Sequence, residues 1–187
     1  MELTRIPLHP LPHLFDRVIA DIQRGLGALT WLDHIFGRCE RLVKAIDGQR
    51  FYTPNWHAGG NEYILLAPDQ HLGNFAFFVL QEPQTVQWQA GERSRLKAPF
   101  SLILWVDMRK VDDYGGRDTE YVKEQVLNLL NGRIWLREGS MEITRIYERA
   151  ENVFQGFTLD EVDNQFLMSP FAGFRFEGTL SITNACI

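Results

Sequence analysis

The most regular pattern of hydrophobic and polar positions lies in residues 99–130. Its first half alternates strictly, so apolar side chains fall on one face of a predicted β-strand. This apolar face consists of Phe100, Leu102, Leu104, Val106 and Met108. The alternation breaks in the turn 112–117, which contains acidic residues and a glycine pair. A helix is then predicted to begin at Asp118 or Thr119 and to run to about Asn131.

The N-terminal part predicts an extended arm followed by a helix. Pro7, Pro10 and Pro12 restrict the backbone of the arm. Apolar residues then recur at the spacing of one helix face. They are Phe15, Val18, Ile19, Ile22 and Leu26. Gly25 and Gly27 mark the expected end of this helix, because glycine commonly ends helices.

A β-hairpin is predicted around the dipeptide Asp47-Gly48. This dipeptide connects two extended runs, residues 38–46 and 49–57, and Asp-Gly is a strong signal for a tight hairpin turn. Pro54 lacks an N–H donor, which indicates an edge position for the second strand.

Further extended runs follow along the chain. They cover residues 63–67, 75–88, 141–147 and 173–183. Residues 75–88 are expected to pair antiparallel with the strand that contains Phe100. Residues 134–136 are expected to pair with residues 141–147 in a second hairpin. The segment 158–161 is typical of a capping box at the start of a short helix.

Strands before and after the helices, linked mostly by hairpins, predict an α+β fold. We expect a mostly antiparallel β-sheet with two helices packed on one face. No linker or internal repeat divides the sequence, so a single domain over residues 1–187 is expected, with a short extended N-terminal arm. With 45% hydrophobic and 23% charged residues, a chain of this size can bury a substantial core without metals or disulfides.

Charge and hydropathy limit the classes of partner. A net charge of −5 argues against binding of nucleic acid, because neutralising phosphates requires an excess of Lys and Arg. No apolar stretch approaches the roughly 20 residues that span a bilayer, and the N-terminus does not resemble a signal peptide. We therefore expect a cytosolic protein with neither nucleic acid nor membrane among its partners.

Acidic residues around the turn 112–117 are the best candidates for a cation site, because hard cations bind several carboxylate oxygens at once. They are Asp107, Asp112, Asp113, Asp118 and Glu120. Their spacing does not match a calcium-binding loop, and Asp118 and Glu120 suit the start of a helix. A solvated turn is the expected interpretation.

The histidines and cysteines show no metal-binding pattern. The histidines are His9, His13, His34, His57 and His71. His9 and His13 have a metal-ligand spacing only on a helix, which the prolines between them disfavour. A disulfide between Cys39 and Cys186 stays open, but free thiols in a reducing compartment are expected. A Cys39–His34 dyad also stays open, against the simpler interpretation of a small buried thiol and an exposed ring.

Other motifs that carry chemistry are not found in the sequence. The glycine pairs at 59–60 and 115–116 lack the lysine of a phosphate-binding loop, and turn chemistry explains both. No serine lies in a nucleophile elbow. The basic segment 93–97 is interpreted as a solvated hairpin tip. We therefore predict no catalytic, cofactor-binding or metal-binding residue and no enzyme.

The order of elements resembles that of the tail terminator, or tail completion, proteins of long-tailed bacteriophages and prophages. The resemblance is carried by an N-terminal helix, hairpin strands, the long strand 100–107, an acid-started helix and the closing strand 174–182. It extends over about residues 12–185 as a likeness of pattern and length, without a diagnostic motif. The chain is longer than compact members of this family, with extra material around residues 58–69 and 149–170.

The resemblance implies a structural virion assembly protein that forms a ring on the growing tail tube, stops its polymerisation and faces the head connector. Its partners would be copies of itself and other tail or head–tail connector proteins. It would be made in the bacterial cytoplasm and end in the virion tail. Sheet edges and the exposed turns at residues 90–97 and 109–117 are the expected contact elements.

The alternative is a small-molecule binding module, or an adaptor protein of a mobile element, in either case without catalysis. A binding module would contain a concave, partly polar cavity lined by aromatic residues, which an assembly subunit does not need.

Overall fold

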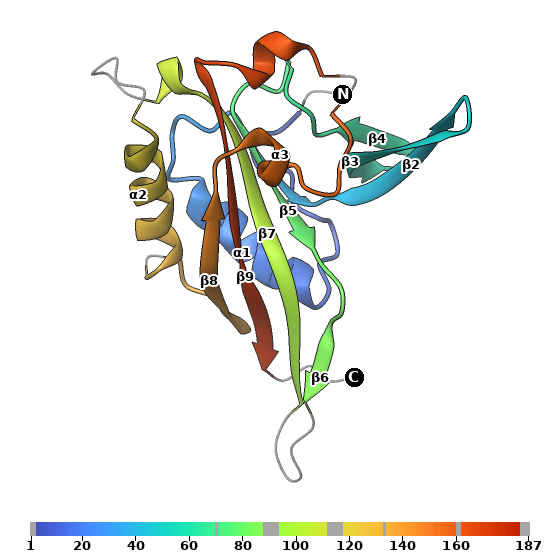
Figure 1. Ribbon diagram of the computed structural model, residues 1–187. Coiled ribbons are helices and arrows are strands. Elements are labelled where there is room, and N and C mark those ends of the chain that lie inside the picture. Colours follow the sequence, from blue (N-terminus) through green and yellow to red (C-terminus); the bar gives the residue numbers. More distant parts are fainter. Residues whose placement is uncertain are drawn as a thin grey trace.

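The computed structural model describes residues 3–69, 71–87, 94–111, 118–132, 134–159 and 162–183. Within these residues the chain forms a larger β-sheet flanked by helices and a smaller sheet that projects from one side of it (Figure 1).

The larger sheet has the strand order β1-β5-β7-β9-β8, and β6 extends it beside β7. Its strands are β1 (His34–Arg38), β5 (Phe75–Leu80), β6 (Thr85–Gln87), β7 (Arg95–Asp107), β8 (Gly139–Tyr147) and β9 (Phe171–Thr183). Strands β1 and β5 are parallel, and the other described pairs are antiparallel. The predicted α+β fold with a mostly antiparallel sheet is therefore confirmed. The parallel pair arises because the smaller sheet lies between β1 and β5 in the sequence and forms their crossover connection.

Two helices cover one face of the larger sheet, as predicted. They are α1 (Phe15–Leu26) and α2 (Thr119–Leu130). Ile19 of α1 and Val122 of α2 share one hydrophobic core with the inward residues of β7 and β9. Asp118 accepts a hydrogen bond from the Glu120 N–H at 2.9 Å, so α2 begins where the sequence predicts it.

Strand β7 is central because both of its faces are buried along its second half. Leu102 and Leu104 face the core beneath α1 and α2. Ile103 and Trp105 face a second core on the opposite side of the sheet. This second core is covered partly by the short helix α3 (Ala150–Val153). The alternation predicted for this strand is confirmed.

The smaller sheet has the order β2-β3-β4. Its strands are β2 (Glu40–Ile46), β3 (Gln49–Gly59) and β4 (Glu62–Leu65). Asp47 and Gly48 form the predicted turn with φ of 49° and 80°. The edge position predicted from Pro54 is wrong, because β3 lies between β2 and β4. The Pro54 carbonyl accepts a hydrogen bond from the Leu66 N–H at 2.8 Å, and Leu66 lies just past the end of β4. The missing N–H of Pro54 is on this same side of β3, where β4 has already ended, so no hydrogen bond between strands is lost.

The outer part of the β2–β3 hairpin, residues 43–52, extends away from the larger sheet and is called the projecting hairpin below (Figure 1). Its base is held by Thr158, which lies more than a hundred residues later in the sequence. The Thr158 N–H donates to the Tyr52 carbonyl at 2.7 Å, and Thr158 Oγ1 accepts from the Tyr52 N–H at 3.1 Å. Beyond Tyr52 the hairpin continues as a two-stranded ribbon.

The predicted second hairpin is wrong in its first strand, residues 134–136, because these residues lie against α1. Ile134 packs on Gly25, where a Cβ atom would clash with it. Arg137 Nη2 donates to Asp21 Oδ1 at 2.7 Å. Burial alone would raise the pKa of Asp21, but the hydrogen bonds and charge of Arg137 outweigh it and lower the pKa below its ordinary value. Strand β8 pairs with β9 instead.

The short helix predicted from the segment 158–161 begins later than expected. It is the 3₁₀ helix η2 (Asn164–Leu167), and Asp163 caps it by accepting from the Gln165 N–H at 3.1 Å. Thr158 is not the cap, because its hydroxyl is engaged at the base of the projecting hairpin. The acidic residues of the expected capping box, 160–161, lie outside the described residues.

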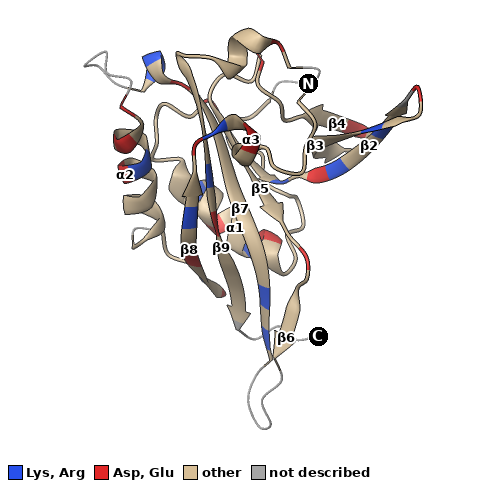
Figure 2. Ribbon diagram, in the orientation of Figure 1, with Lys and Arg blue, Asp and Glu red and all other residues tan. Residues whose placement is uncertain are grey.

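Among the described residues, no helix is both long and apolar enough to cross a membrane. Acidic and basic residues both occur along the projecting hairpin, α2 and β8 in the view of Figure 2.

A close approach between β8 and β9 gives a test of this topology. Gly178 of β9 lies opposite a bulge in β8 between Ile143 and Arg145. A Cβ atom on Gly178 would clash with the carbonyl oxygen of Glu142. We expect Gly178→Ala to lower the free energy of unfolding by about 2 kcal/mol, because the two strands must separate to admit the methyl group. Urea unfolding followed by circular dichroism measures the loss.

Gly132→Ala is the matched control, because a Cβ atom at Gly132 meets no described atom within 4 Å. Its free energy of unfolding should stay within about 0.5 kcal/mol of the original chain. An equal loss in both variants would contradict the close approach of β8 and β9.

Candidate functional site

The acidic residues considered as a cation site have other partners. Asp107 ends β7 and caps the 3₁₀ helix η1 (Met108–Lys110). Arg109 donates to Asp107 through Nε at 2.9 Å and Nη2 at 2.7 Å, and these hydrogen bonds lower the pKa of Asp107. Glu120 accepts from Lys123 at 2.6 Å. Asp112 and Asp113 lie outside the described residues.

Within the described part of the chain, no group of three or more His, Cys, Asp or Glu side chains is placed to hold a metal ion.

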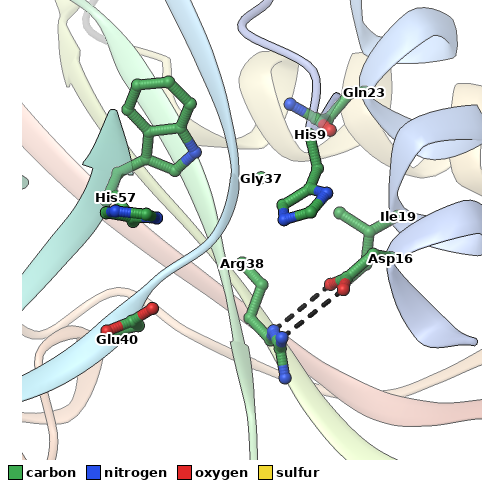
Figure 3. Close-up of a pocket in the computed structure, with 9 residues that line it drawn as sticks. His9, Asp16, Ile19, Gln23, Gly37, Arg38, Glu40 and His57 are labelled. Carbon is green, nitrogen blue, oxygen red and sulfur yellow. Dashed lines mark hydrogen bonds and ion pairs between the residues drawn. The ribbon is translucent and has the colours of Figure 1, made fainter. Parts of the chain in front are cut away.

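Two of the histidines line a small hollow between the N-terminal arm, α1, β1 and β3 (Figure 3). Its volume is about 60 Å³, far below the roughly 300 Å³ of the smallest ligand pockets. His9 Nδ1 accepts from the Leu11 N–H at 3.2 Å, and His57 Nε2 lies 3.0 Å from the Gly60 carbonyl oxygen. The hollow therefore suits one or two ordered waters at most.

The Cys39–His34 dyad does not form. His34 and Arg38 are the first and last residues of β1, and Cys39 follows Arg38. Because an extended strand rises about 3.3 Å per residue, the backbone of His34 lies about 13 Å from that of Arg38, too far for the imidazole to reach the Cys39 thiol. The Cys39 thiol is buried in the second core, and its burial raises its pKa to about 12. The small buried thiol is therefore found, but the expected exposed ring is not, because His34 is only partly exposed and its Nδ1 is buried without a hydrogen-bond partner among the described residues. Cys186 lies outside the described residues.

The raised pKa of Cys39 predicts a slow thiol. At pH 8 about one thiol in 10,000 is ionised at a pKa of 12, about a thousandfold fewer than for an ordinary cysteine. In a Cys186→Ser variant, the folded protein should therefore react with Ellman's reagent about a thousandfold more slowly than the same variant in 8 M urea. Comparable rates in the two conditions would contradict the burial of Cys39.

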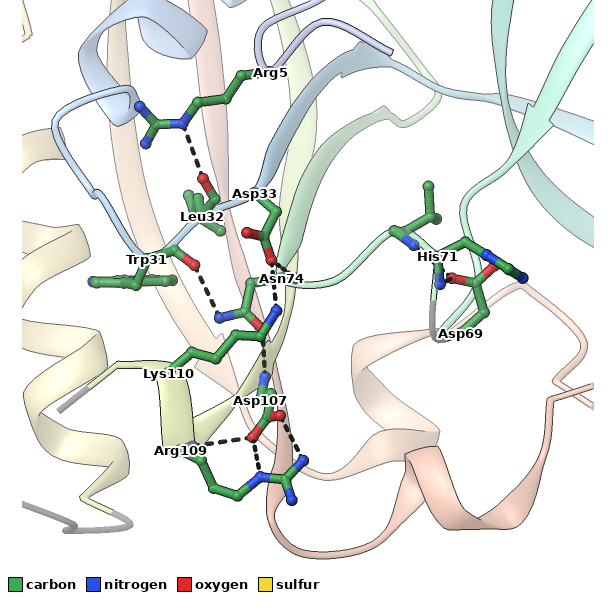
Figure 4. A network of polar contacts seen from close by, with 11 residues as sticks. Arg5, Trp31, Leu32, Asp33, Asp69, His71, Asn74, Asp107, Arg109 and Lys110 are labelled. Carbon is green, nitrogen blue, oxygen red and sulfur yellow. Dashed lines mark hydrogen bonds and ion pairs between the residues drawn. The ribbon is translucent and has the colours of Figure 1, made fainter. Parts of the chain in front are cut away.

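Asn74 is a fully buried polar residue just before β5, with hydrogen bonds to two other segments (Figure 4). Its Nδ2 donates to the Trp31 carbonyl at 2.9 Å, and its Oδ1 accepts from the Asp107 N–H at 2.6 Å. Its own N–H donates to Asp33 Oδ2 at 2.7 Å. Lys110 Nζ donates to the same carboxylate oxygen at 3.1 Å. Asn74 thus ties the start of β1, the start of β5 and the end of β7 together, which is a structural role.

Loss of the Asn74 side chain should strongly destabilise the fold. Asn74→Ala leaves the Asp107 N–H and the Trp31 carbonyl without their partner, at a cost of about 3 kcal/mol in the free energy of unfolding. Urea unfolding checks this value, with Asn131→Ala as the control because the Asn131 side chain is exposed after α2. An Asn74→Ala variant as stable as the control would show that the network is dispensable.

The glycine pairs and the basic segment carry no ligand chemistry among the described residues. Gly59 and Gly60 form the tight turn from β3 to β4, with φ of 108° and 59°. Arg95 and Lys97 belong to β7 and face β6. Arg93 and Trp88, and the glycine pair at 115–116, lie outside the described residues.

A hollow with a volume of about 790 Å³ lies where the two sheets meet. We call it the arginine hollow, because Arg41 of β2, Arg145 of β8 and Arg175 of β9 line it. Two glutamates, Glu82 and Glu177, also line it. The hollow therefore carries one excess positive charge on a chain whose net charge is −5.

Arg175 forms the rigid floor of the arginine hollow. Only 4% of this residue is exposed. Its Nε donates to Glu177 Oε1 at 2.8 Å, and its Nη1 donates to the Gln155 carbonyl at 3.2 Å. The guanidinium thus holds the turn after α3 onto the sheet and keeps the Glu177 carboxylate occupied.

The sequence analysis did not predict the arginine hollow. The alternation of β8 and β9 contains a signal for part of it. Arg145 and Tyr147 lie on one face of β8, and Arg175 and Glu177 lie on one face of the neighbouring strand β9. The register pairs Arg145 with Glu177 and Tyr147 with Arg175. Arg41 has no such signal, because it comes from the other sheet.

Comparison of the sequence with protein-family models and with curated proteins finds no match.

Proposed function

We propose that this protein is a structural subunit that assembles into a ring, as tail terminator proteins of long-tailed phages do, and that it acts through protein–protein contacts without catalysis. Its partners would be copies of itself and other tail or head–tail connector proteins. It would be made in the bacterial cytoplasm and become part of the virion tail. The observation that carries the proposal is the projecting hairpin, residues 43–52.

The projecting hairpin has little to stabilise it within one chain. A two-stranded ribbon is marginally stable in water, and beyond Tyr52 this one has neither β4 nor Thr158 beside it. Val43 is 56% exposed, although valine is an apolar β-former. A neighbouring subunit that covered the hairpin would bury this surface and pair its free edge.

The position of the hairpin suits a head-to-tail contact. It lies on the side of the molecule opposite α2 and β8 (Figure 1). β8 is the terminal strand of the larger sheet, so one of its edges is unpaired in the described fold. A contact between two different surfaces of identical subunits generates a ring when the rotation closes.

A second candidate function is a small-molecule binding module. The arginine hollow favours it, because its volume falls within the range of about 300–1,000 Å³ that is typical of ligand sites.

Shortening the projecting hairpin tests the assembly proposal. Deletion of residues 45, 46, 49 and 50 joins Lys44 to Phe51, which are cross-strand partners, through the original Asp-Gly turn. We expect light scattering to show a discrete closed oligomer for the original chain and a loss of at least tenfold in association for the shortened chain. The reason is that the shortened chain lacks the outermost contact surface.

The control is the fold of the shortened chain, which circular dichroism and urea unfolding should show to be retained, because the deleted residues lie beyond the Thr158 anchor. Undiminished assembly of the shortened chain would exclude the hairpin as the contact. A strict monomer at every concentration and salt for the original chain would contradict self-assembly.

A further inference from the structure

We propose that the arginine hollow binds a small organic anion, in which a phosphate or carboxylate group is attached to an apolar body. The proposal does not depend on ring formation, because all the residues that it uses belong to one chain.

Two of the three arginines have no carboxylate partner among the described residues. Arg145 lies opposite Glu177 in the register of β8 and β9, but the Glu177 carboxylate is bound to Arg175 at 2.8 Å. Arg41 lies over the Tyr52 ring at 3.8 Å, a contact that holds its side chain without neutralising its charge. Two arginines without a bound carboxylate therefore line one hollow, and Glu82 is the one acidic residue of the lining that is not bound to Arg175.

The donor chemistry selects the ligand class. A guanidinium presents paired N–H donors that match the oxygens of a phosphate or carboxylate, and it is weakly hydrated compared with an ammonium group. Arg175 is buried in the floor of the hollow and is paired with Glu177, so this pair adds no net charge to the site. An oxyanion in the hollow would thus gain attraction from Arg41 and Arg145.

Part of the remaining lining can contact an apolar body next to the anionic group, whereas Gln81 and Gln155 add polar amide groups. Val79 of β5 and Phe157 after α3 line the hollow together with Tyr147 of β8. Ligand sites typically combine mostly apolar walls with a few convergent polar groups. Glu82, which also lines the hollow, disfavours ligands whose negative charge covers their whole surface.

Calorimetric titration of the full chain at low salt tests the proposal. The probes are phenyl phosphate and benzoate, which carry the two anionic groups on the same apolar ring. We expect one site per chain, at least tenfold weaker binding for Arg145→Gln and for Arg41→Gln, and weaker binding as salt increases. Arg50→Gln is the matched control, because Arg50 is exposed on the projecting hairpin and does not line the hollow.

Each outcome decides the proposal. Binding of phenyl phosphate alone assigns a phosphate ligand, and binding of benzoate alone assigns a carboxylate, provided that both hollow variants weaken it. Absence of binding by both probes, or binding that Arg145→Gln and Arg41→Gln leave unchanged, overturns the proposal. Benzyl alcohol, which has the ring without the charge, should bind at least tenfold more weakly than the better probe, and equal binding would also overturn it.

The test is separate from the assembly proposal. Arg41 and Arg145 are exposed, so both variants should unfold at the urea concentration of the original chain. Light scattering on the same samples shows whether assembly persists. If Arg41→Gln and Arg145→Gln lose probe binding but still assemble, the result concerns the hollow alone. If the chain with the shortened hairpin loses assembly but still binds the probe, the result concerns the ring alone.

Discussion

The fold depends on one constraint, which is that β7 must be kept from water on both of its faces. Its second half has no solvent-facing side, and its apolar residues point alternately into two separate cores. The first core needs α1 and α2, and the second needs α3 and the base of the smaller sheet. Two polar groups of β7 are paired in this dry environment, because the Asp107 N–H donates to Asn74 and Ser101 Oγ accepts from Gln81 at 2.9 Å. The Trp105 indole N–H is buried in the same strand without a partner among the described residues.

The parts of the fold that the sequence predicts well are those in which one local rule decides the outcome. The alternation of β7, the cap of α2 at Asp118 and the Asp-Gly turn of β2 and β3 each follow from residues that are neighbours in the chain. Residues 134–136 show where such rules fail. Ile134 packs on α1 and Trp135 is exposed, and the neighbouring Arg137 binds a buried carboxylate that lies more than a hundred residues earlier. Propensity is weak compared with such a contact.

Long-range contacts also explain why neither Asn74 nor the arginine hollow was predicted. Asn74 precedes a strand and looks like an ordinary turn residue, yet its partners come from two separate segments, residues 31–33 and the end of β7. The arginine hollow is lined by residues of β2, β8 and β9. Only the pairing of β8 with β9 could be predicted from the alternation of polar and apolar residues. The wrong prediction of an edge position from Pro54 has a similar cause. The length of β4 decides whether the missing N–H of Pro54 costs a hydrogen bond between strands.

The anchoring of the projecting hairpin by Thr158 has a mechanical consequence. Arg41 lies in β2, the strand that leads into the projecting hairpin, whereas Arg145 belongs to β8 of the larger sheet, so the two walls of the hollow come from two different sheets. The Thr158–Tyr52 hydrogen bonds join the base of the hairpin to the segment after α3. Binding of a neighbouring subunit to the projecting hairpin would determine the width of the hollow. Binding of a ligand to both walls of the hollow would determine the angle between the hairpin and the larger sheet. Such coupling is reciprocal by thermodynamic necessity, so binding at the hollow or at the hairpin would change the binding affinity at the other place.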